Sequence, residues 1–338
     1  MTLRDVAERA GVSVTTASFV LSGRHEMRIS VATEERVLQA ARMLDYRRRL
    51  VSAAALPTGA PAIGLISDVI ATESFAGEML RGCIAAANDR GHVVLIADSE
   101  GADELEESAV QALVSRGVDK FVYATLGTIV YRVPESLRGR HLVLMNNIDP
   151  TLAVPAVIPD DYRAGRVAVE TLAAAGHTTG IWLVGRTAPG AFAARKRLAG
   201  VRAGLRAAGL RLAGQVHCGW WPDESRRAVT ELLGDGWWQA ARPTAVIAMN
   251  DRAAMGVYQA LTAAGRRVPD DLSVVSFDNS DLSRWLHPAL SSMDLPYFDI
   301  GRKAVDLLIG DCGEPRVHKL AMELRPRGSI AAPPRIKY

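Results

Sequence analysis

Short apolar runs alternate with amphipathic, helix-like segments along the chain from residue 62 onward. Continuous apolar runs of this length are typical of strands that are buried on both faces of a sheet. Such runs occupy residues 63–67, 93–97, 121–124, 142–145, 181–184, 245–248 and 272–277. Several intervening segments end on glycine, as at Gly176 and Gly209, which is a common way to end a helix. The alternation predicts an α/β protein with doubly wound parallel sheets, and so long a series favours two subdomains over one sheet.

The first 46 residues have the spacing of short helices instead. Two helices meet at Gly11, and Ser13 is placed to cap the second one. Helical spacing gives this second helix an inner face of Ala17, Val20 and Leu21 and an outer face of Val14, Thr15, Ser18 and Phe19. A third helix follows Ser30 and ends near Tyr46. The pattern predicts an all-α helix-turn-helix, a motif whose second helix lies in the major groove of DNA.

The small positive charge of the chain is concentrated at one place. The sequence has 40 Lys and Arg against 37 Asp and Glu, a net charge of +3. Residues 1–46 hold six basic and six acidic residues, and residues 50–338 hold 31 of each. The excess therefore lies in Arg47, Arg48 and Arg49, directly after the predicted DNA-binding motif. We expect these three residues to neutralise DNA phosphates.

Several function classes are disfavoured by what the sequence lacks. The three cysteines, at positions 83, 218 and 312, have no metal-ligand spacing and indicate a reducing compartment. No apolar leader or membrane-length run is present, so we expect a cytoplasmic protein without membrane association. The sequence also has no P-loop, no strand followed by Gly-x-Gly-x-x-Gly and no Gly-x-Ser-x-Gly. We therefore expect no catalytic residues, no cofactor and no metal.

The N-terminal residues also match a known family. Residues 5–18 read Asp-Val-Ala-x-x-Ala-Gly-Val-Ser-x-x-Thr-x-Ser, which closely resembles the N-terminus of the lactose/galactose repressor (LacI/GalR) family of bacterial transcription regulators. The resemblance continues in residues 250–256, 268–278 and 288–292. It implies a sequence-specific DNA-binding regulator with a two-lobed domain like a periplasmic sugar-binding protein, which holds an effector in its cleft.

The resemblance also implies a domain organisation. The helix-turn-helix domain would span residues 1–46, and a hinge helix and linker would span 47–61, where Pro57 and Pro61 interrupt the chain. Residues 62–338 would form the effector-binding and dimerisation domain. Its lobe 1 would hold about 62–158 and 294–318, and its lobe 2 about 159–291 and 319–330.

The DNA-contacting residues follow from the same resemblance. The positions that match base-reading residues of the family are Val14, Thr15 and Phe19, and those that match phosphate contacts are Thr16 and Ser18. Many relatives have Arg where this chain has Phe19, so the bidentate contact of Arg with guanine is lost here. In the hinge, Leu56 is the residue expected to wedge into the minor groove.

Polar residues at strand ends are candidates for the effector site. Ligands of open parallel sheets bind at the carboxyl ends of the strands. The polar residues at such ends are Asp68, Asn146, Asp160, Asn250 and Asp278. The alternative for each of them is that it caps the helix that follows.

Other candidates come from the resemblance and from side-chain chemistry. Arg197 matches the family arginine that hydrogen-bonds the effector, and its planar fork suits vicinal hydroxyls or a carboxylate. The adjacent Trp220 and Trp221 offer flat faces for a sugar ring, although a buried core tryptophan is the alternative. Phe75 matches a loop that approaches effectors in relatives, and Trp285 is a weaker candidate near Asp278.

The sequence thus favours a repressor of carbohydrate-utilisation genes with a sugar effector. A homodimer on a palindromic operator is expected, since one helix-turn-helix reads only a half-site. Effector binding would close the lobes and separate or melt the hinge helices. Two alternatives stay open: a nucleobase or other non-sugar effector, and a sugar-binding protein without a DNA function.

Overall fold

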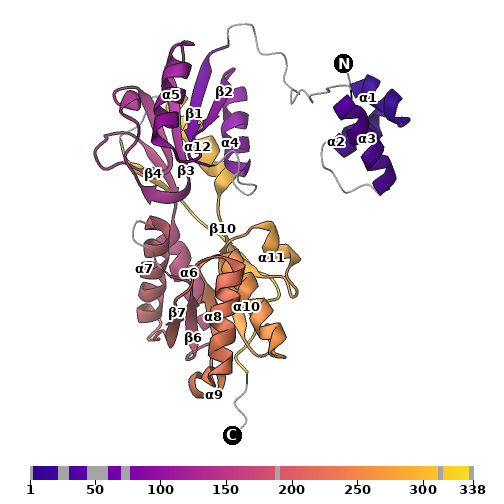
Figure 1. Cartoon of the computed structure of the whole chain (residues 1–338). Helices are drawn as coiled ribbons and strands as arrows, with labels where there is room; N and C mark the ends of the chain where they lie inside the picture. Colours follow the sequence, from indigo (N-terminus) through magenta and orange to yellow (C-terminus); the bar gives the residue numbers. More distant parts are fainter. Residues whose placement is uncertain are drawn as a thin grey trace. The chain divides into compact units, whose positions relative to one another are not determined.

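The structure of the chain is a computed structural model (Figure 1). It describes residues 3–21, 30–43, 60–69, 77–186, 191–310 and 315–334. The chain forms two compact units, Met1–Pro57 and Thr58–Tyr338. The boundary between these units falls within residues 47–61, the segment expected to be hinge and linker. Phe75, Leu56 and residues 47–49 lie outside the described residues.

The first unit contains three helices, α1 (Leu3–Ala10), α2 (Val14–Leu21) and α3 (Val31–Met43). Small apolar side chains from all three helices form its core: Val6, Ala7, Ala10, Ala17, Val37, Ala40 and Ala41. The backbone N–H of Thr16 donates to Ser13 Oγ at 3.0 Å, which caps α2 as predicted. The turn before α2 contains Gly11 at φ +63°, a conformation that glycine adopts without strain.

Lobe 1 of the second unit is built on a six-stranded sheet with the order β11-β5-β4-β3-β1-β2. Its strands are β1 (Ala62–Ser67), β2 (Val93–Asp98), β3 (Lys120–Val130), β4 (His141–Ile148), β5 (Ala156–Pro159) and β11 (Val317–Leu320). The strand pairings within this sheet are parallel. Because the chain runs outward from β1 to β2 and then returns to β3, the strand order reverses between β1 and β3. Such a reversal is where open α/β sheets bind ligands.

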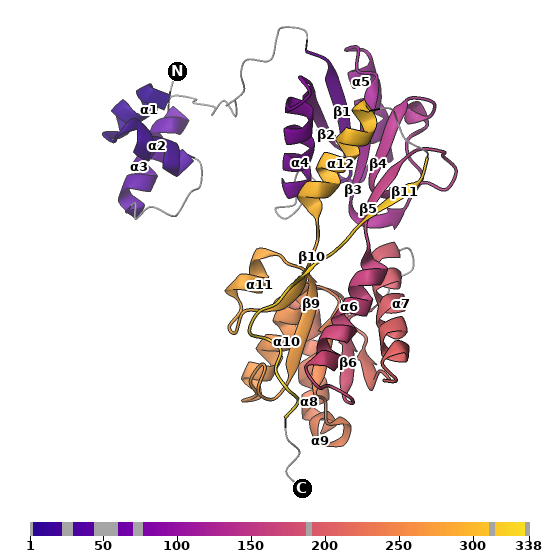
Figure 2. The same ribbon diagram turned by 180° about the vertical axis from the view of Figure 1, so that it is seen from behind.

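Alternate side chains of the lobe 1 strands face two different helix layers. Ile63 and Leu65 pack with α4 (Gly77–Asn88) and α12 (Tyr297–Ile309). Ile66 and Phe121 pack on the other face with α5 (Asp103–Val114) and η2 (Glu135–Leu137). Figure 2 shows α12, drawn in yellow, beside α4 although the two helices are far apart in sequence.

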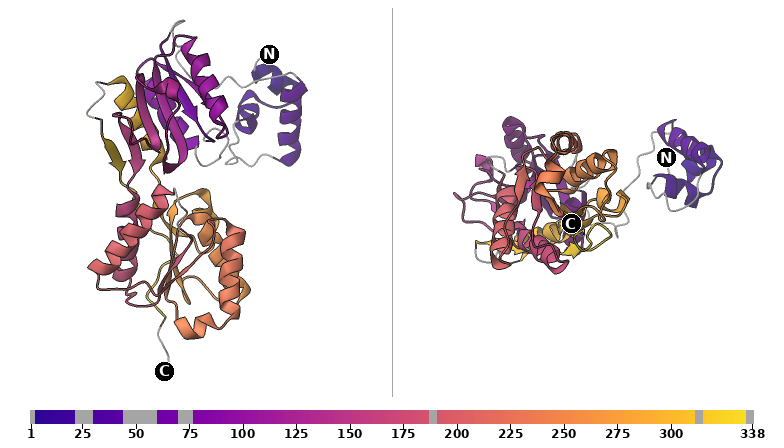
Figure 3. Two further views of the ribbon diagram at one scale, coloured as in Figure 1. Left: turned by 60° about the vertical axis from the view of Figure 1, so that its left-hand side comes forward. Right: turned by 90° about the horizontal axis from the view of Figure 1, so that it is seen from below.

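Lobe 2 has a similar architecture with the strand order β12-β10-β9-β8-β6-β7, in which β12 pairs antiparallel with β10 and the other pairings are parallel. Its strands are β6 (Ile181–Val184), β7 (Gly214–Val216), β8 (Ala245–Ala248), β9 (Ser273–Asp278), β10 (Ser291–Asp294) and β12 (Leu324–Arg325). One face is covered by α6 (Asp161–Ala174) and α7 (Phe192–Ala207), and the other by α8 (Pro222–Gly234) and α10 (Asp251–Ala263). Figure 3 shows the sheet between these two layers. The short helices α9 (Trp237–Ala241) and α11 (Asp281–Trp285) complete the lobe.

The described chain passes between the lobes at three places. It crosses from β5 to α6, from β10 to α12, and from β11 to β12. β10 stays in lobe 2 as far as Asp294, and β11 stays in lobe 1 as far as Leu320. The second and third crossings therefore lie a few residues later than the sequence placed them.

The strands predicted from apolar runs are present at nearly the predicted residues, and Gly176 and Gly209 adopt positive φ. One part of that prediction is wrong. The strand at Val93–Asp98 is not fully buried, because β2 is the edge strand of its sheet and Leu95 and Ile96 are exposed. The shorter strands β5, β7, β10, β11 and β12 were not identified from the sequence.

Candidate functional site

A cavity of about 240 Å³ lies where the carboxyl ends of the two sheets face each other. Both lobes contribute to its wall. Six of the predicted residues line it: Asn146, Arg197, Trp220, Trp221, Asn250 and Asp278. The other lining residues are Leu126, Gly127, Thr128, Pro159, Ala193, Arg252, Leu295 and Tyr297. The fold thus brings strand ends that are distant in sequence into one polar and aromatic site.

Arg197 is fixed in this cavity by three hydrogen bonds. Its side chain is only 4% exposed, and its Nε donates to Asp161 Oδ1 at 2.7 Å. Nη1 donates to the carbonyl oxygen of Met249 at 2.6 Å, and Nη2 lies 3.5 Å from Asp278 Oδ1. These contacts join α6, α7, β9 and the residue that follows β8 in lobe 2. A guanidinium held by this many partners is oriented before any ligand arrives.

Burial changes the acidity of the groups around Arg197. It raises the pKa of Asp278 to about 7, although the charge of Arg197 opposes this shift. Burial likewise raises the pKa of the Asp161 carboxyl against the same opposing charge. For Arg197 itself burial would lower the pKa, but the two carboxylates outweigh it and raise the pKa. Arg197 is therefore charged throughout the accessible pH range, whereas Asp278 titrates near neutrality.

Two strand residues in the cavity have unusual backbone conformations. Asn146 has φ 56° and Asp278 has φ 106°, values that non-glycine residues rarely adopt. In lobe 1 the β3–β4 register also shifts between Ala124 and Ile129, and the chain in that shift lines the cavity. Asn146 Nδ2 donates to the carbonyl oxygen of Leu126 at 3.2 Å, which holds this irregular segment. Strained backbone and bulges cluster at functional sites, so these features mark the cavity independently of its chemistry.

The two tryptophans have different surroundings. Trp220 donates from Nε1 to the carbonyl oxygen of Arg186 at 2.9 Å and has Arg197 5.6 Å from its ring centroid. Trp221 is 55% exposed, and the guanidinium of Arg252 lies 4.3 Å from its ring centroid. Trp220 is therefore partly buried against the core of lobe 2, whereas Trp221 is exposed, and an arginine lies over each ring.

Sequence reasoning missed Arg252 and Tyr297. Arg252 follows the strand-end residue Asn250 by two positions, so extending the strand-end search into the first helical turn would have found it. Tyr297 is the first residue of α12, directly after a crossing between lobes, and it lines the cavity. Burial raises the pKa of Tyr297, so its hydroxyl is neutral at physiological pH.

Three of the described candidates, Asp68, Asp160 and Trp285, do not line the cavity. Asp160 caps α6, since its Oδ1 accepts a hydrogen bond from the N–H of Arg163 at 3.2 Å, while the next residue, Asp161, bonds Arg197. Trp285 is 73% exposed on α11 and is absent from the lining. Asp160 and Trp285 therefore do not join the residues that line this cavity, because Asp160 turns toward its own helix and Trp285 toward solvent. Asn250 has both roles, since it caps α10 and lines the cavity.

Asp68 directly follows β1 and does not line the cavity. Its carboxylate accepts a hydrogen bond from the N–H of Leu126 at 3.0 Å. It therefore supports the loop that lines the cavity.

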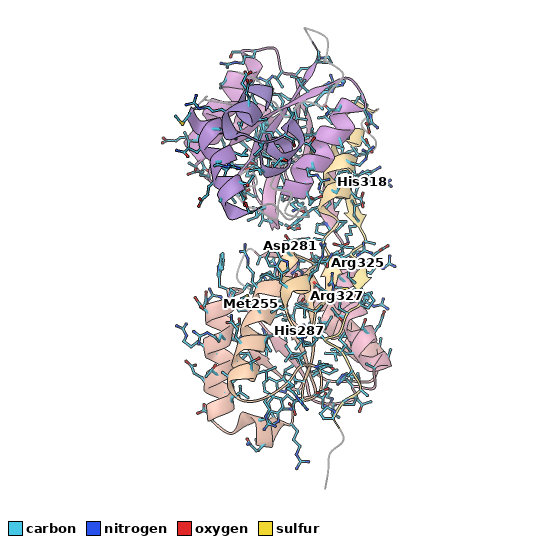
Figure 4. The ribbon with its side chains drawn as sticks, turned by 90° about the vertical axis from the view of Figure 1, so that its right-hand side faces the viewer. Met255, Asp281, His287, His318, Arg325 and Arg327 are labelled. Carbon is cyan, nitrogen blue, oxygen red and sulfur yellow. The ribbon has the colours of Figure 1, made fainter. Side chains whose placement is uncertain are left out.

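A second cavity of about 500 Å³ lies beyond a wall formed by Asp278, Leu295 and Tyr297. Its charged lining residues are mostly acidic and include Glu78, Asp281, Asp294 and Asp299, with Arg284 as the basic member. Figure 4 shows Asp281 at the end of lobe 2 that faces lobe 1. The two cavities therefore differ in charge, because Arg197 and Arg252 line the smaller cavity and do not line the larger one.

The first unit exposes the start of its second helix. Val14 is 44% exposed, and Thr15 is also exposed. Thr16 is half-buried, and its hydroxyl shares a hydrogen bond with Ser13 Oγ at 2.8 Å. The side chains of Ser18 and Phe19 lie outside the described ones. The exposed N-terminal end of α2 is the part that meets base edges in a helix-turn-helix.

The described ranges contain no group of three or more His, Cys, Asp or Glu side chains that is placed to hold a metal ion. None of the helices described is both long enough and apolar enough to cross a bilayer.

Comparisons with known proteins agree with the two-unit organisation. Residues 2–49 match the family model of bacterial regulatory proteins, lacI family, and residues 169–330 match that of the periplasmic binding protein-like domain. The sucrose operon repressor of Shigella flexneri is 32% identical over 314 residues, which cover 89% of this chain and 91% of that repressor.

Two solved structures are similar in fold and sequence. A LacI-family transcriptional regulator of Rhizobium etli has a TM-score of 0.71 and 28% identity, covering 80% of this chain and 99% of its own. The transcriptional regulator CelR in complex with cellobiose has a TM-score of 0.65 and 26% identity. The match covers 97% of this chain and 99% of CelR. The likeness to CelR thus extends over nearly the whole chain.

Proposed function

The chain belongs to the lacI family of bacterial regulatory proteins, DNA-binding transcriptional repressors that respond to small molecules, and we propose that it represses carbohydrate-utilisation genes under the control of a sugar bound between its lobes. The observation that carries the proposal is the preorganised Arg197 in a cavity that both lobes line. We place the protein in the bacterial cytoplasm and assign it no catalytic activity.

The sugar assignment rests on the chemistry of the cavity. A planar guanidinium and the amides of Asn146 and Asn250 can bond several hydroxyl groups at once. The faces of Trp220 and Trp221 can pack against the apolar side of a sugar ring. The names of two similar proteins, the sucrose operon repressor and the CelR–cellobiose complex, support a carbohydrate effector. A nucleobase is the second candidate, because the same aromatic faces suit a planar ring.

The DNA assignment rests on the first unit. Val14 and Thr15 would meet base edges, and Thr16 and Ser18 would contact phosphates. Phe19 would contact a thymine methyl group instead of bonding guanine. We expect a homodimer on a palindromic operator, with Arg47, Arg48 and Arg49 on the backbone and Leu56 in the minor groove.

Control of DNA binding would arise from a shift between two conformations. The crossings between the lobes are short, so the lobes can rotate about them when a ligand bonds both walls of the cavity. We propose that this closure repositions the two hinges of the dimer and changes their fit to the operator. A coupling of this kind is commonly worth about 1–3 kcal/mol.

The test is fluorescence anisotropy with labelled DNA from upstream of the protein's own gene. Binding is measured at two salt concentrations, with and without a panel of sugars and a purine base. Specific, salt-sensitive binding that one sugar alters would support the proposal. A response to the purine alone would replace the sugar with a nucleobase, and absence of specific binding at either salt concentration would contradict the operator assignment.

A further inference from the structure

The exposed side of helices α6 and α7 in lobe 2 is strongly basic. Its basic side chains, called the basic face below, are Arg163, Arg166, Arg195, Lys196, Arg202 and Arg206. Over these two helices, which the structure describes throughout, the one exposed acidic residue is Glu170. We propose that the basic face binds the phosphate backbone of a second DNA duplex while the helix-turn-helix domains hold the operator. This inference goes beyond the proposed function, because it assigns a ligand to a surface that neither the operator nor the effector is expected to occupy.

The spacing of these residues places them in two adjacent rows. On α7, Arg195, Arg202 and Arg206 are seven and four residues apart, so they lie on one side of the helix. This row is about 16 Å long at about 1.5 Å of rise per residue. On α6, Arg163 and Arg166 are three residues apart and form the second row. The two helices pack side by side on one side of lobe 2, so the rows together make one surface (Figures 1 and 2).

Most of this charge has no counter-charge within the protein. In the part of the chain that the structure describes, four of the six side chains are in no ion pair: Arg163, Arg195, Arg202 and Arg206. Arg166 is paired with Glu170 at 3.0 Å. Lys196 lies 5.1 Å from the ring centroid of Phe192, a contact that leaves its charge in place. The rows of α6 and α7 therefore present several arginines that are free to bind an external anion.

The neighbouring elements do not supply the missing negative charge. α7 contains five basic residues and no acidic one. Asp160, at the start of α6, offsets part of the charge of Arg163, and Glu323 beside β12 is paired with Arg325 at 3.5 Å. On the other side of the same sheet, α8 and α10 hold four acidic and three basic residues. The excess is therefore local, since residues 50–338 as a whole hold equal numbers of acidic and basic residues.

The composition of the basic face fits DNA better than a protein partner. The centre of a protein–protein interface is rich in aromatic and other apolar side chains. On α6 and α7, Tyr162 is the one large apolar side chain that is exposed, and small Ala199 and Ala207 lie between the arginines of α7. Interfaces with DNA are more polar and much more positively charged. Five of the six basic residues are arginines, whose planar fork bonds phosphate at two points, and a tyrosine hydroxyl can donate to phosphate as well.

The face belongs to a different compact unit from the helix-turn-helix, the part of the chain expected to read the operator. Contacts of arginine with phosphate carry no sequence information, so this face would accept DNA of any sequence. A dimer has two such faces and both of its helix-turn-helix domains are used by one palindrome. The proposal therefore predicts that an operator-bound dimer can hold a neighbouring stretch of DNA.

The experiment uses the full chain saturated with an unlabelled operator duplex that is just long enough to cover the palindrome. A fluorescent duplex of unrelated sequence is then added, and its binding is followed by anisotropy over a series of salt concentrations. One double variant, Arg202→Gln with Arg206→Gln, removes two charges, and a second, with Lys at both positions, keeps them. Gln and Lys are both good helix formers, so α7 should stay folded. The matched control is Arg226→Gln with Arg227→Gln, which makes the same charge change at exposed positions of α8.

We expect the operator-bound wild type and the α8 control to bind the unrelated duplex, with an affinity that falls as salt rises. The Gln double variant should bind it at least about fivefold more weakly at low salt. Its slope of log affinity against log salt should be smaller by about 2, since each phosphate contact contributes about 0.9. The Lys variant should keep most of the binding, and operator affinity should be the same in all four proteins. Equal binding by the Gln variant and the control, or no binding of the second duplex by the wild type, would overturn the inference.

A second copy of the chain is the other occupant that the test distinguishes. Self-association of the DNA-free chain is measured by sedimentation at low and high salt. Salt-sensitive association that the Gln variant loses, without binding of a second duplex, would overturn the inference in favour of a protein contact. If no operator is bound, the proposed function fails, and the free chain is titrated with the unrelated duplex instead. Weaker binding by the Gln variant than by the α8 control then still supports the basic face, and equal binding overturns it.

Discussion

At the scale of single residues, the buried Arg197–Asp161 pair is the least replaceable part of the cavity. Both side chains are almost fully buried, and a charge left there without its partner is costly. Arg197→Met should therefore lower the free energy of unfolding by about 3–5 kcal/mol, measured by urea denaturation. The control is Arg195→Met on the exposed face of the same helix, which should change it by less than about 0.5 kcal/mol. Equal effects of the two substitutions would show that the buried pair is not needed.

The titration of Asp278 gives a pH-dependent prediction. Its pKa in the folded chain is about 7, against an ordinary value of 3.8, so the folded state binds more protons than the unfolded state between these values. The contribution of Asp278 to stability should therefore be largest at low pH and should decrease as the pH rises from about 4 to 7.

Asp278→Asn removes this titration. Urea unfolding of both proteins at pH 5 and pH 7.5 should show that the wild type loses more stability, relative to the variant, at the higher pH. A difference that does not depend on pH would contradict the raised pKa.

Residue identities at the site were only partly predictable from the sequence. A strand end and the helix after it can be recognised, but a shift of one residue decides which side chain supports the site, and here Asp161 bonds Arg197 while Asp160 caps the helix. Tyr297 could not be found by the same reasoning, because it reaches the cavity only after the chain has crossed between lobes. Such positions depend on tertiary packing rather than on local pattern.

At the scale of elements, α7 presents Arg197 only because it packs closely on α6. A Cβ atom on Gly200 would collide with the carbonyl oxygen of Tyr162, so Gly200→Ala must push the helices apart. We expect it to lower the free energy of unfolding by about 1–3 kcal/mol and to weaken binding of the proposed sugar effector through displacement of Arg197.

The matched control for this substitution is Gly234→Ala at the end of α8. No atom lies within 4 Å of a Cβ built there. Alanine should therefore be neutral or stabilise the protein by up to about 1 kcal/mol. Urea denaturation of the two variants side by side checks both expectations. If Gly200→Ala leaves the free energy of unfolding unchanged, the contact between α6 and α7 can relax to make room for the methyl group.

Elements with strong local signals were the ones that the sequence predicted well. The runs that became β1, β3, β4, β6, β8 and β9 are apolar and lie within their sheets, so their burial and their pattern agree. β11 and β12 have mixed composition and are held by pairing with remote strands, as Val317 is with Ala156. No local pattern reveals such a pairing. The prediction that β2 is fully buried was wrong for a different reason. Its residues are apolar, but the strand lies at the edge of its sheet.

At the scale of the whole molecule, the crossings between the lobes make the cavity sensitive to lobe rotation. Arg197, Trp220 and Asp278 come from lobe 2, whereas Asn146 and Thr128 come from lobe 1. A ligand that bonds both sets is bound more tightly when the lobes are closed. It can therefore shift the conformational equilibrium only by its difference in affinity for the two states.

Coupling between the effector cavity and the operator must be reciprocal. If a sugar weakens operator binding by some factor, saturating operator DNA must weaken sugar binding by the same factor, and a corepressor would strengthen both equally. Couplings of about 1–3 kcal/mol correspond to factors of about 5 to 150, which titration can resolve. The sugar Kd is measured on the free and DNA-saturated chain, and the operator Kd with and without saturating sugar. Unequal factors would mean that the sugar acts through a second site or a change in assembly, because two sites linked through one conformational equilibrium must give the same factor in both directions.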